Sequence, residues 1–125
     1  MLQVNHLYKS YKTGNTTYEV LKDVSFSIEE GEFVAVMGPS GSGKTTLLNC
    51  ISCFIPHDRG EILLDGVNIS NMKEEQIAKI RNEKLGFVFQ DFMLLDGLSV
   101  FENVCVPKVI HQEPYRQMET KAQKL

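Results

Sequence analysis

Eight residues in the first half of the chain have the spacing of a phosphate-binding loop. The run from Gly38 to Thr45 reads G-P-S-G-S-G-K-T, which fits the pattern G-x-x-x-x-G-K-[ST]. Glycines let a backbone turn with its N–H groups directed inward, so that several donors converge on phosphate oxygens. Lys44 adds a positive charge for the β- and γ-phosphates, and the Thr45 hydroxyl is a suitable ligand for Mg²⁺. The spacing therefore predicts a site for a nucleoside triphosphate.

The segments on either side of this loop are those that such a loop requires. Residues 32–37 are apolar and β-branched, which predicts a buried parallel strand. The apolar residues after the loop follow a helical spacing, and they are Leu47, Leu48, Ile51, Phe54 and Ile55. A helix that starts here directs its free N–H groups and positive dipole end at the phosphates. The candidate binding residues are Gly38, Pro39, Ser40, Gly41, Ser42, Gly43, Lys44, Thr45 and Thr46.

Length and charge limit the possible function classes. The chain has 125 residues and a formal net charge of −3, so it fits one domain and offers no basic field for nucleic acid. It contains no run of about 18 apolar residues and does not begin like a signal peptide. We expect a cytoplasmic protein that can dock on a membrane protein.

Three cysteines, Cys50, Cys53 and Cys105, make a disulfide framework improbable. Cys50 and Cys53 form a C-x-x-C pair that, together with His57, has three of the four ligands of a zinc site. The pair falls within the predicted helix after the phosphate loop, where small apolar side chains pack against a sheet. Packing is therefore the favoured interpretation.

The segments on both sides of this core predict a pair of antiparallel strands, a hairpin, a surface helix and a second buried strand. Residues 1–30 alternate like two strands joined by a turn, and residues 60–70 form a hairpin with an Asp65-Gly66 turn. Asn71 is the expected N-cap of a surface helix that runs to Lys84. Residues 85–90 form a second candidate for a buried strand, ending at Gln90.

The end of the chain predicts two helices within residues 99–125. Ser99 and Glu102 have the spacing of a capping box, and Pro107 should end the helix that they start. Pro114 should start the last helix, with Met118 on its apolar stripe.

Taken together, these pieces resemble the ATP-binding subunits of ABC transporters. The runs that carry the resemblance are 11–14, 20–26, 31–49, 85–90 and 91–104. Within the family, the chain is most similar to subunits that serve permeases of the macrolide-export, lipoprotein-release and antimicrobial-peptide-resistance type. The resemblance implies an α/β fold in which a P-loop NTPase core, with a parallel sheet and helices, is joined to an N-terminal antiparallel β subdomain. Residues 1–125 would be its N-terminal part, with the P-loop core at 32–55, and would stop before the helical signature subdomain is complete.

The resemblance also implies roles for individual residues and partners. Tyr11 would stack on adenine, and Gln90 would contact Mg²⁺ and the attacking water, so that Lys44 and Gln90 are the catalytic candidates and Thr45 and Gln90 the metal ligands. Residues 91–98 would contact an integral-membrane permease, and a second ATP-binding subunit would pair head to tail. The protein would lie on the inner face of the cell membrane with ATP and Mg²⁺ as cofactors. From the residues alone, Tyr11 could equally cover the sheet, and the apolar residues at 92–95 could be core.

In this family, hydrolysis depends on parts that the sequence does not contain. They are an L-S-G-G-Q-like signature, a strand ending in Asp, an adjacent Glu that acts as general base, and a switch His. We therefore expect the isolated chain to be a fragment, prone to association and nearly inactive. The alternatives are a related ATPase of DNA repair or translation, a P-loop kinase or GTPase, and a fragment that binds nucleotide without any activity of its own.

Overall fold

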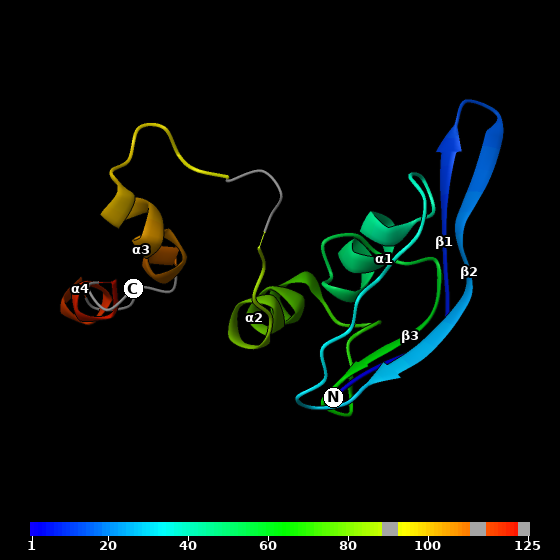
Figure 1. Ribbon diagram of the computed structural model, residues 1–125, viewed down its shortest axis with the longest axis horizontal. Helices are drawn as coiled ribbons and strands as arrows, with labels where there is room; N and C mark the ends of the chain where they lie inside the picture. Colours follow the sequence, from blue (N-terminus) through cyan, green and yellow to red (C-terminus); the bar gives the residue numbers. More distant parts are fainter. Residues whose placement is uncertain (89–92, 111–114, 123–125) are drawn as a thin grey trace. The chain divides into compact units, whose positions relative to one another are not determined.

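The computed structural model describes residues 1–88, 93–110 and 115–122, which divide into two compact units, Met1–Gly86 and Phe87–Leu125. Each unit is described by itself. The elements of the first unit are β1 (Leu2–Thr13), β2 (Thr16–Ile28), α1 (Lys44–Ile51), β3 (Arg59–Leu64), β4 (Val67–Asn68) and α2 (Glu74–Lys84). The second unit contains α3 (Val100–Ile110) and α4 (Tyr115–Ala122) (Figure 1). None of the helices described is long and apolar enough to cross a membrane.

The strands of the first unit form one antiparallel sheet with the order β2-β1-β3-β4. A hairpin joins β1 to β2, and its register pairs Tyr11 with Tyr18. The Asp65-Gly66 turn joins β3 to β4, as predicted, and both turn residues have a positive φ, 50° and 77°. Such a pair of left-handed residues gives the turn a twist that matches the flanking strands. The predicted antiparallel β subdomain is therefore present.

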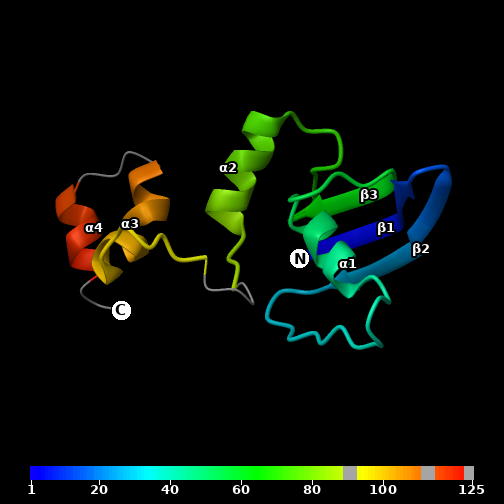
Figure 2. The same ribbon diagram turned by 90° about the horizontal axis from the view of Figure 1, so that it is seen from above.

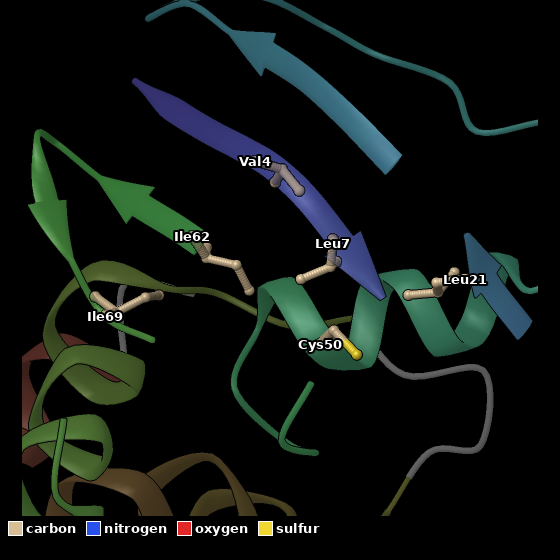
Figure 3. Packing of buried hydrophobic residues seen from close by; sticks show 6 residues of the cluster. All are labelled: Val4, Leu7, Leu21, Cys50, Ile62 and Ile69. Carbon is tan, nitrogen blue, oxygen red and sulfur yellow. The ribbon is translucent and has the colours of Figure 1, made fainter. Parts of the chain in front are cut away.

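Helix α1 packs against one face of this sheet (Figures 1 and 2). The core between them contains Val4, Leu7, Leu21, Cys50, Ile62 and Ile69 (Figure 3). Each of these side chains is at most 4% exposed. Burying an aliphatic side chain to this degree contributes roughly 1.5–3 kcal/mol. The face of α1 that carries Cys50 is thus held against β1 and β2.

Helix α1 ends at Ile51, earlier than the predicted 55. The Ser52 hydroxyl donates back to the Leu48 carbonyl at 2.5 Å, and Cys53 has a φ of 59°. A left-handed residue cannot continue a right-handed helix, so the chain turns here. The N–H groups of residues 54 and 55 then both donate to the Asn49 carbonyl.

The cysteine pair is divided by this helix end. Cys50 belongs to the core, where burial raises its pKa to about 11. Cys53 lies just beyond the helix and is half-buried, and desolvation raises its pKa as well. A buried thiol with a raised pKa behaves as a small hydrophobic side chain, in agreement with packing as the role of Cys50.

The strand predicted at residues 32–37 is not formed. These residues have no regular secondary structure, and Phe33 and Met37 are 97% and 88% exposed. The run at 85–88 is also irregular, whereas Gln90 lies outside the described residues. A parallel strand is held by hydrogen bonds to neighbouring strands and is covered on both faces. Within the described part of the chain, residues 32–37 have no such neighbour.

The N-cap of helix α2 lies two residues later than the predicted cap at Asn71. Its N-cap is Lys73, whose N–H donates to Gln76 Oε1 at 3.1 Å. No residue of this helix is buried, although Ile80 packs against the edge of the core. The predicted surface position of the helix is confirmed.

Helix α3 begins with the predicted capping box but does not end where expected. The Ser99 N–H and hydroxyl both donate to Glu102 Oε2 at 2.7 Å, and the Glu102 N–H donates to Ser99 Oγ at 3.3 Å. The helix then continues through Pro107 to Ile110. A proline removes one helical hydrogen bond but does not prevent the chain from keeping a helical path. In α4, Met118 is 7% exposed, as its place on the predicted stripe suggested.

Candidate nucleotide-binding site

The phosphate loop is held between strand β2 and the start of helix α1. Gly43 is the N-cap of α1 and has a φ of 91°, a conformation that favours glycine. A Cβ atom at this position would lie 3.0 Å from Val20 Cγ1 and 3.2 Å from the Val20 carbonyl oxygen. A side chain at this position would therefore crowd β2 and strain the backbone, so the position favours glycine. Gly41, with a φ of 78°, makes the preceding turn.

The Lys44 ammonium closes the loop from the other side. Its Nζ donates to the carbonyl oxygens of Gly38 and Pro39 at 2.9 and 2.7 Å and lies 3.3 Å from Ser42 Oγ. The Ser42 N–H donates to the Pro39 carbonyl at 3.3 Å. Hydrogen bonds to an ionised acceptor are stronger than those to neutral carbonyls. A phosphate at the loop would thus compete well for the same ammonium donors.

A hollow of about 260 Å³ lies at the start of α1. It is lined by Val20, Gly41, Gly43, Lys44, Thr45 and Thr46. The first N–H groups of a helix have no partner within the helix and carry its positive dipole end. The first turn of α1 contains no acidic side chain that would repel an anion. The hollow therefore combines free N–H donors, a lysine and two hydroxyl groups, a set suited to phosphate.

One of the hydroxyl groups also suits a magnesium ion. The Thr45 hydroxyl is a hard oxygen ligand on the wall of the hollow. Mg²⁺ takes only one or two protein oxygens beside phosphate oxygens and water. Thr45 would hold the ion, whose chemistry is to bridge and neutralise the phosphate oxygens.

Tyr11, the residue expected to stack on adenine, is not among the described residues that line this hollow. Tyr11 lies near the end of β1, is 42% exposed, and its ring centroid is 5.5 Å from Lys9 Nζ. The strand is fastened beside it, because the Ser10 N–H donates to Asp58 Oδ2 at 2.6 Å. Although desolvation opposes it, hydrogen bonds from Ser10 and Lys9 lower the pKa of Asp58. The stacking role of Tyr11 stays a prediction, and Gln90 lies outside the described residues.

Val20 is a site residue that the sequence did not reveal. It lines the hollow and touches the position where Gly43 would carry a side chain. The alternation along residues 18–28 marks strand β2, but it does not say which loop packs upon it. The only available signal was the requirement that a strand support the phosphate loop.

Comparisons with known proteins extend this picture. The family model described as "ABC transporter" matches residues 21–125. The ABC transporter ATP-binding protein YxdL of Bacillus subtilis is 54% identical over 121 residues, which are 97% of this chain and 47% of that protein. The bacitracin export ATP-binding protein BceA of Halalkalibacterium halodurans is 41% identical, with 97% of this chain and 48% of that protein covered. The chain thus spans about half the length of these relatives.

A solved structure resembles the chain equally clearly. The ATP-binding cassette MJ0796, in a dimeric post-hydrolysis state bound to ADP and Pi, has a TM-score of 0.90 and 37% identity. The match covers 99% of this chain and 55% of that chain. It confirms the predicted fold class, a P-loop NTPase with an N-terminal antiparallel β subdomain, which is present here in part.

Proposed function

Because the chain belongs to the ABC transporter family, we propose that it is the nucleotide-binding half of an ATP-binding subunit that powers a membrane permease. The observation that carries this proposal is the phosphate loop, clamped by Lys44 on one side and by Val20 of β2 on the other. The relative named for bacitracin export favours a permease of the exporter or antimicrobial-peptide-resistance type.

Lys44, Thr45 and Thr46 have defined tasks in binding Mg-ATP. The Lys44 ammonium exchanges the carbonyls of Gly38 and Pro39 for the β- and γ-phosphates. Backbone N–H groups at the start of α1 hold the phosphate oxygens, and Thr45 orients the magnesium ion. Thr46 offers a second hydroxyl for the α-phosphate. In this proposal the loop supplies positioning and charge neutralisation, which dominate catalysis of phosphoryl transfer.

Two further residues complete the nucleotide site in the proposal. The exposed ring of Tyr11 is available to stack on adenine, a contact that grips a purine by its flat face. Gln90 follows the segment 85–88 and would orient the attacking water and contact Mg²⁺. Hydrolysis itself is proposed for the whole subunit, in which a second copy would complete each site.

The partner surface lies in the segment 91–98. Of its described residues, Met93, Leu94 and Leu95 are 67%, 64% and 52% exposed. Consecutive exposed apolar side chains of this kind commonly mark a protein interface. We assign them to contact with the cytoplasmic part of a permease, which would place the subunit on the inner face of the membrane.

Calorimetry with Mg-ATP tests the nucleotide part of the proposal. The wild-type chain should bind ATP, and Lys44→Ala should weaken binding at least about tenfold because a charge-assisted contact worth roughly 1.5–3 kcal/mol is lost. Lys79→Ala is the matched control, because it also removes one lysine. Lys79 is exposed on α2, where its Nζ lies 3.9 Å from Glu83 Oε1. Equal affinities of wild type and Lys44→Ala would contradict the proposal. Binding without turnover would indicate a half-site that binds nucleotide but needs the rest of the subunit for hydrolysis.

A further inference from the structure

The hairpin of β1 and β2 carries two exposed tyrosines at directly opposite positions. Tyr11 of β1 pairs with Tyr18 of β2 in the strand register, and the two residues are 42% and 57% exposed. Opposite residues of an antiparallel pair project from the same face of the sheet, with Cβ atoms about 5 Å apart. The side chain of Tyr18 makes no hydrogen bond, ion pair or ring contact with the residues that the structure describes. Its exposed ring is thus open to a ligand.

Both rings lie on the face of the sheet against which α1 packs. Lys9 of β1 pairs with Leu21, a core residue that lies beside α1 (Figure 3). Alternate side chains of a strand share a face, so Tyr11 lies on the same face as Lys9, and the Lys9 ammonium is 5.5 Å from the centre of its ring. Tyr18, opposite Tyr11, therefore lies on this face too. The end of the hairpin extends beyond α1 (Figure 1), in agreement with the exposure of both rings.

A bulge in β2 connects the tyrosines to the phosphate hollow. The register shifts between residues 9 and 10 of β1, which leaves Val20 as an extra residue on β2. A Cβ atom at Gly43 would meet Val20 Cγ1 at 3.0 Å and Leu21 Cδ2 at 3.4 Å, so both of these side chains reach the phosphate loop. Val20 also lines the hollow at the start of α1. Tyr18 lies two residues before Val20, roughly 7 Å along the strand, and a ribose can bridge this separation between phosphate and base.

We propose that Tyr18 is a second base-contacting residue, which forms with Tyr11 a two-ring platform that selects a purine nucleotide. Aromatic rings stack on the flat face of a base without reading its edge. Two adjacent rings offer a larger flat surface than one, and a purine has two fused rings where a pyrimidine has one. The platform therefore favours ATP over CTP. The inference rests on the proposed function, because it adds a specificity residue to the same nucleotide site.

NMR of the tyrosine ring signals tests the contact with the base directly. The 125-residue chain is titrated with Mg-ATP and, separately, with tripolyphosphate and Mg²⁺, which supply the phosphates without a base. The ring signals of Tyr11 and Tyr18 should shift with Mg-ATP alone. The Tyr8 ring is the internal control, because it lies against Arg59, whose guanidinium carbon is 4.1 Å from the ring centre. Its signals should stay in place with both ligands.

Calorimetry with matched variants supplies the second readout. Tyr18→Leu keeps a bulky apolar side chain on the strand but removes the aromatic face, so Mg-ATP binding should weaken about tenfold. Tyr18→Phe keeps the ring and should bind like wild type, as should the control Tyr8→Leu. Wild type should bind CTP about fivefold more weakly than ATP, and Tyr18→Leu should narrow this difference. Tripolyphosphate should bind wild type and all three variants equally, because none of the changes touches the phosphate loop.

The outcomes separate this inference from the proposed function. Wild-type ATP affinity in Tyr18→Leu, or Tyr18 ring signals that ignore ATP, would overturn the role of Tyr18. An equal loss for ATP and tripolyphosphate would also overturn it, because the variant would then have disturbed the phosphate loop. An unchanged ratio of ATP to CTP affinity in Tyr18→Leu would overturn the selection of purines. The proposed function is tested by Lys44→Ala on the same ligands, and it fails only if ATP and tripolyphosphate bind without need of Lys44.

Discussion

Gly43 is the residue of the phosphate loop that packs directly against strand β2. Its neighbours across the loop are the side chain and carbonyl of Val20, at 3.0 and 3.2 Å from the place of a Cβ atom. Its φ of 91° is a conformation that side chains rarely adopt. The residue therefore links the geometry of β2 to the direction in which α1 presents its N–H groups.

Replacing Gly43 by alanine should weaken Mg-ATP binding. The added methyl group meets Val20, and the left-handed conformation costs a non-glycine residue roughly 1–3 kcal/mol, so the loop must shift. We expect a loss of about tenfold in affinity by calorimetry, with the far-UV circular dichroism unchanged. Gly97→Ala is the control, because nothing lies within 4 Å of the added atom at that position. Wild-type affinity in Gly43→Ala would show that this contact does not set the loop.

The helices show which element boundaries a sequence can specify. The start of α3 was predicted because a capping box is built from residues three apart, Ser99 and Glu102. The end of α1 was not predicted, because it depends on the left-handed turn at Cys53. Likewise, Pro107 marks a lost hydrogen bond but not whether the surrounding helix survives that loss.

Among the strands and in the phosphate site, too, the features that adjacent residues determine were predicted and the others were not. The Asp65-Gly66 hairpin and the phosphate loop were predicted because their geometry follows from a few adjacent residues. The apolar run at 32–37 has the composition of a strand, but a strand also needs a hydrogen-bonded neighbour, which composition does not supply. Val20 was missed because it acts through a contact between β2 and the phosphate loop.

Removing the cap of α3 should loosen the first turn of that helix and change its pH dependence. Ser99→Ala deletes the hydroxyl that donates a hydrogen bond to Glu102. Losing a cap lowers the stability of the helix, so hydrogen exchange of the first helical amides should speed up about fivefold. The bonds from Ser99 lower the pKa of Glu102. Their stabilising effect is thus present above the ordinary glutamate pKa and is lost as the pH falls through the lowered value.

NMR titration of the Glu102 carboxyl measures this effect. Its pKa should rise toward the ordinary value in Ser99→Ala, whereas Ser99→Thr should retain the wild-type behaviour because it keeps the hydroxyl. An unchanged Glu102 pKa in Ser99→Ala would mean that the capping box does not operate in solution.

At the scale of the whole molecule, apolar side chains divide between a packed core and a solvent-exposed set. Val4 and Leu7 are 0% exposed in the core of Met1–Gly86, whereas Phe33 and Met37 in the same unit are 97% and 88% exposed. Exposed apolar residues next to unpaired backbone favour association between chains. The expectation that the isolated chain associates therefore has a defined origin in residues 32–37.

Replacing both Phe33 and Met37 by serine should reduce self-association. The exposed apolar area falls while the core is untouched, so sedimentation velocity should show a larger monomer fraction at the same concentration. Leu7→Ala is the contrasting variant, because a buried leucine lost from the core costs roughly 2–5 kcal/mol of stability and should increase association. A monomeric wild-type chain that unfolds cooperatively would contradict this account.

The most direct test of the account is an amide NMR titration of the 125-residue chain with Mg-ATP. The account predicts that the largest shifts occur at Gly41, Gly43, Lys44 and Thr45, which line the hollow at the start of α1. It also predicts that these shifts disappear in Lys44→Ala. Shifts confined to other parts of the chain, or shifts at the loop that persist without Lys44, would contradict the claim that this loop is a nucleotide site.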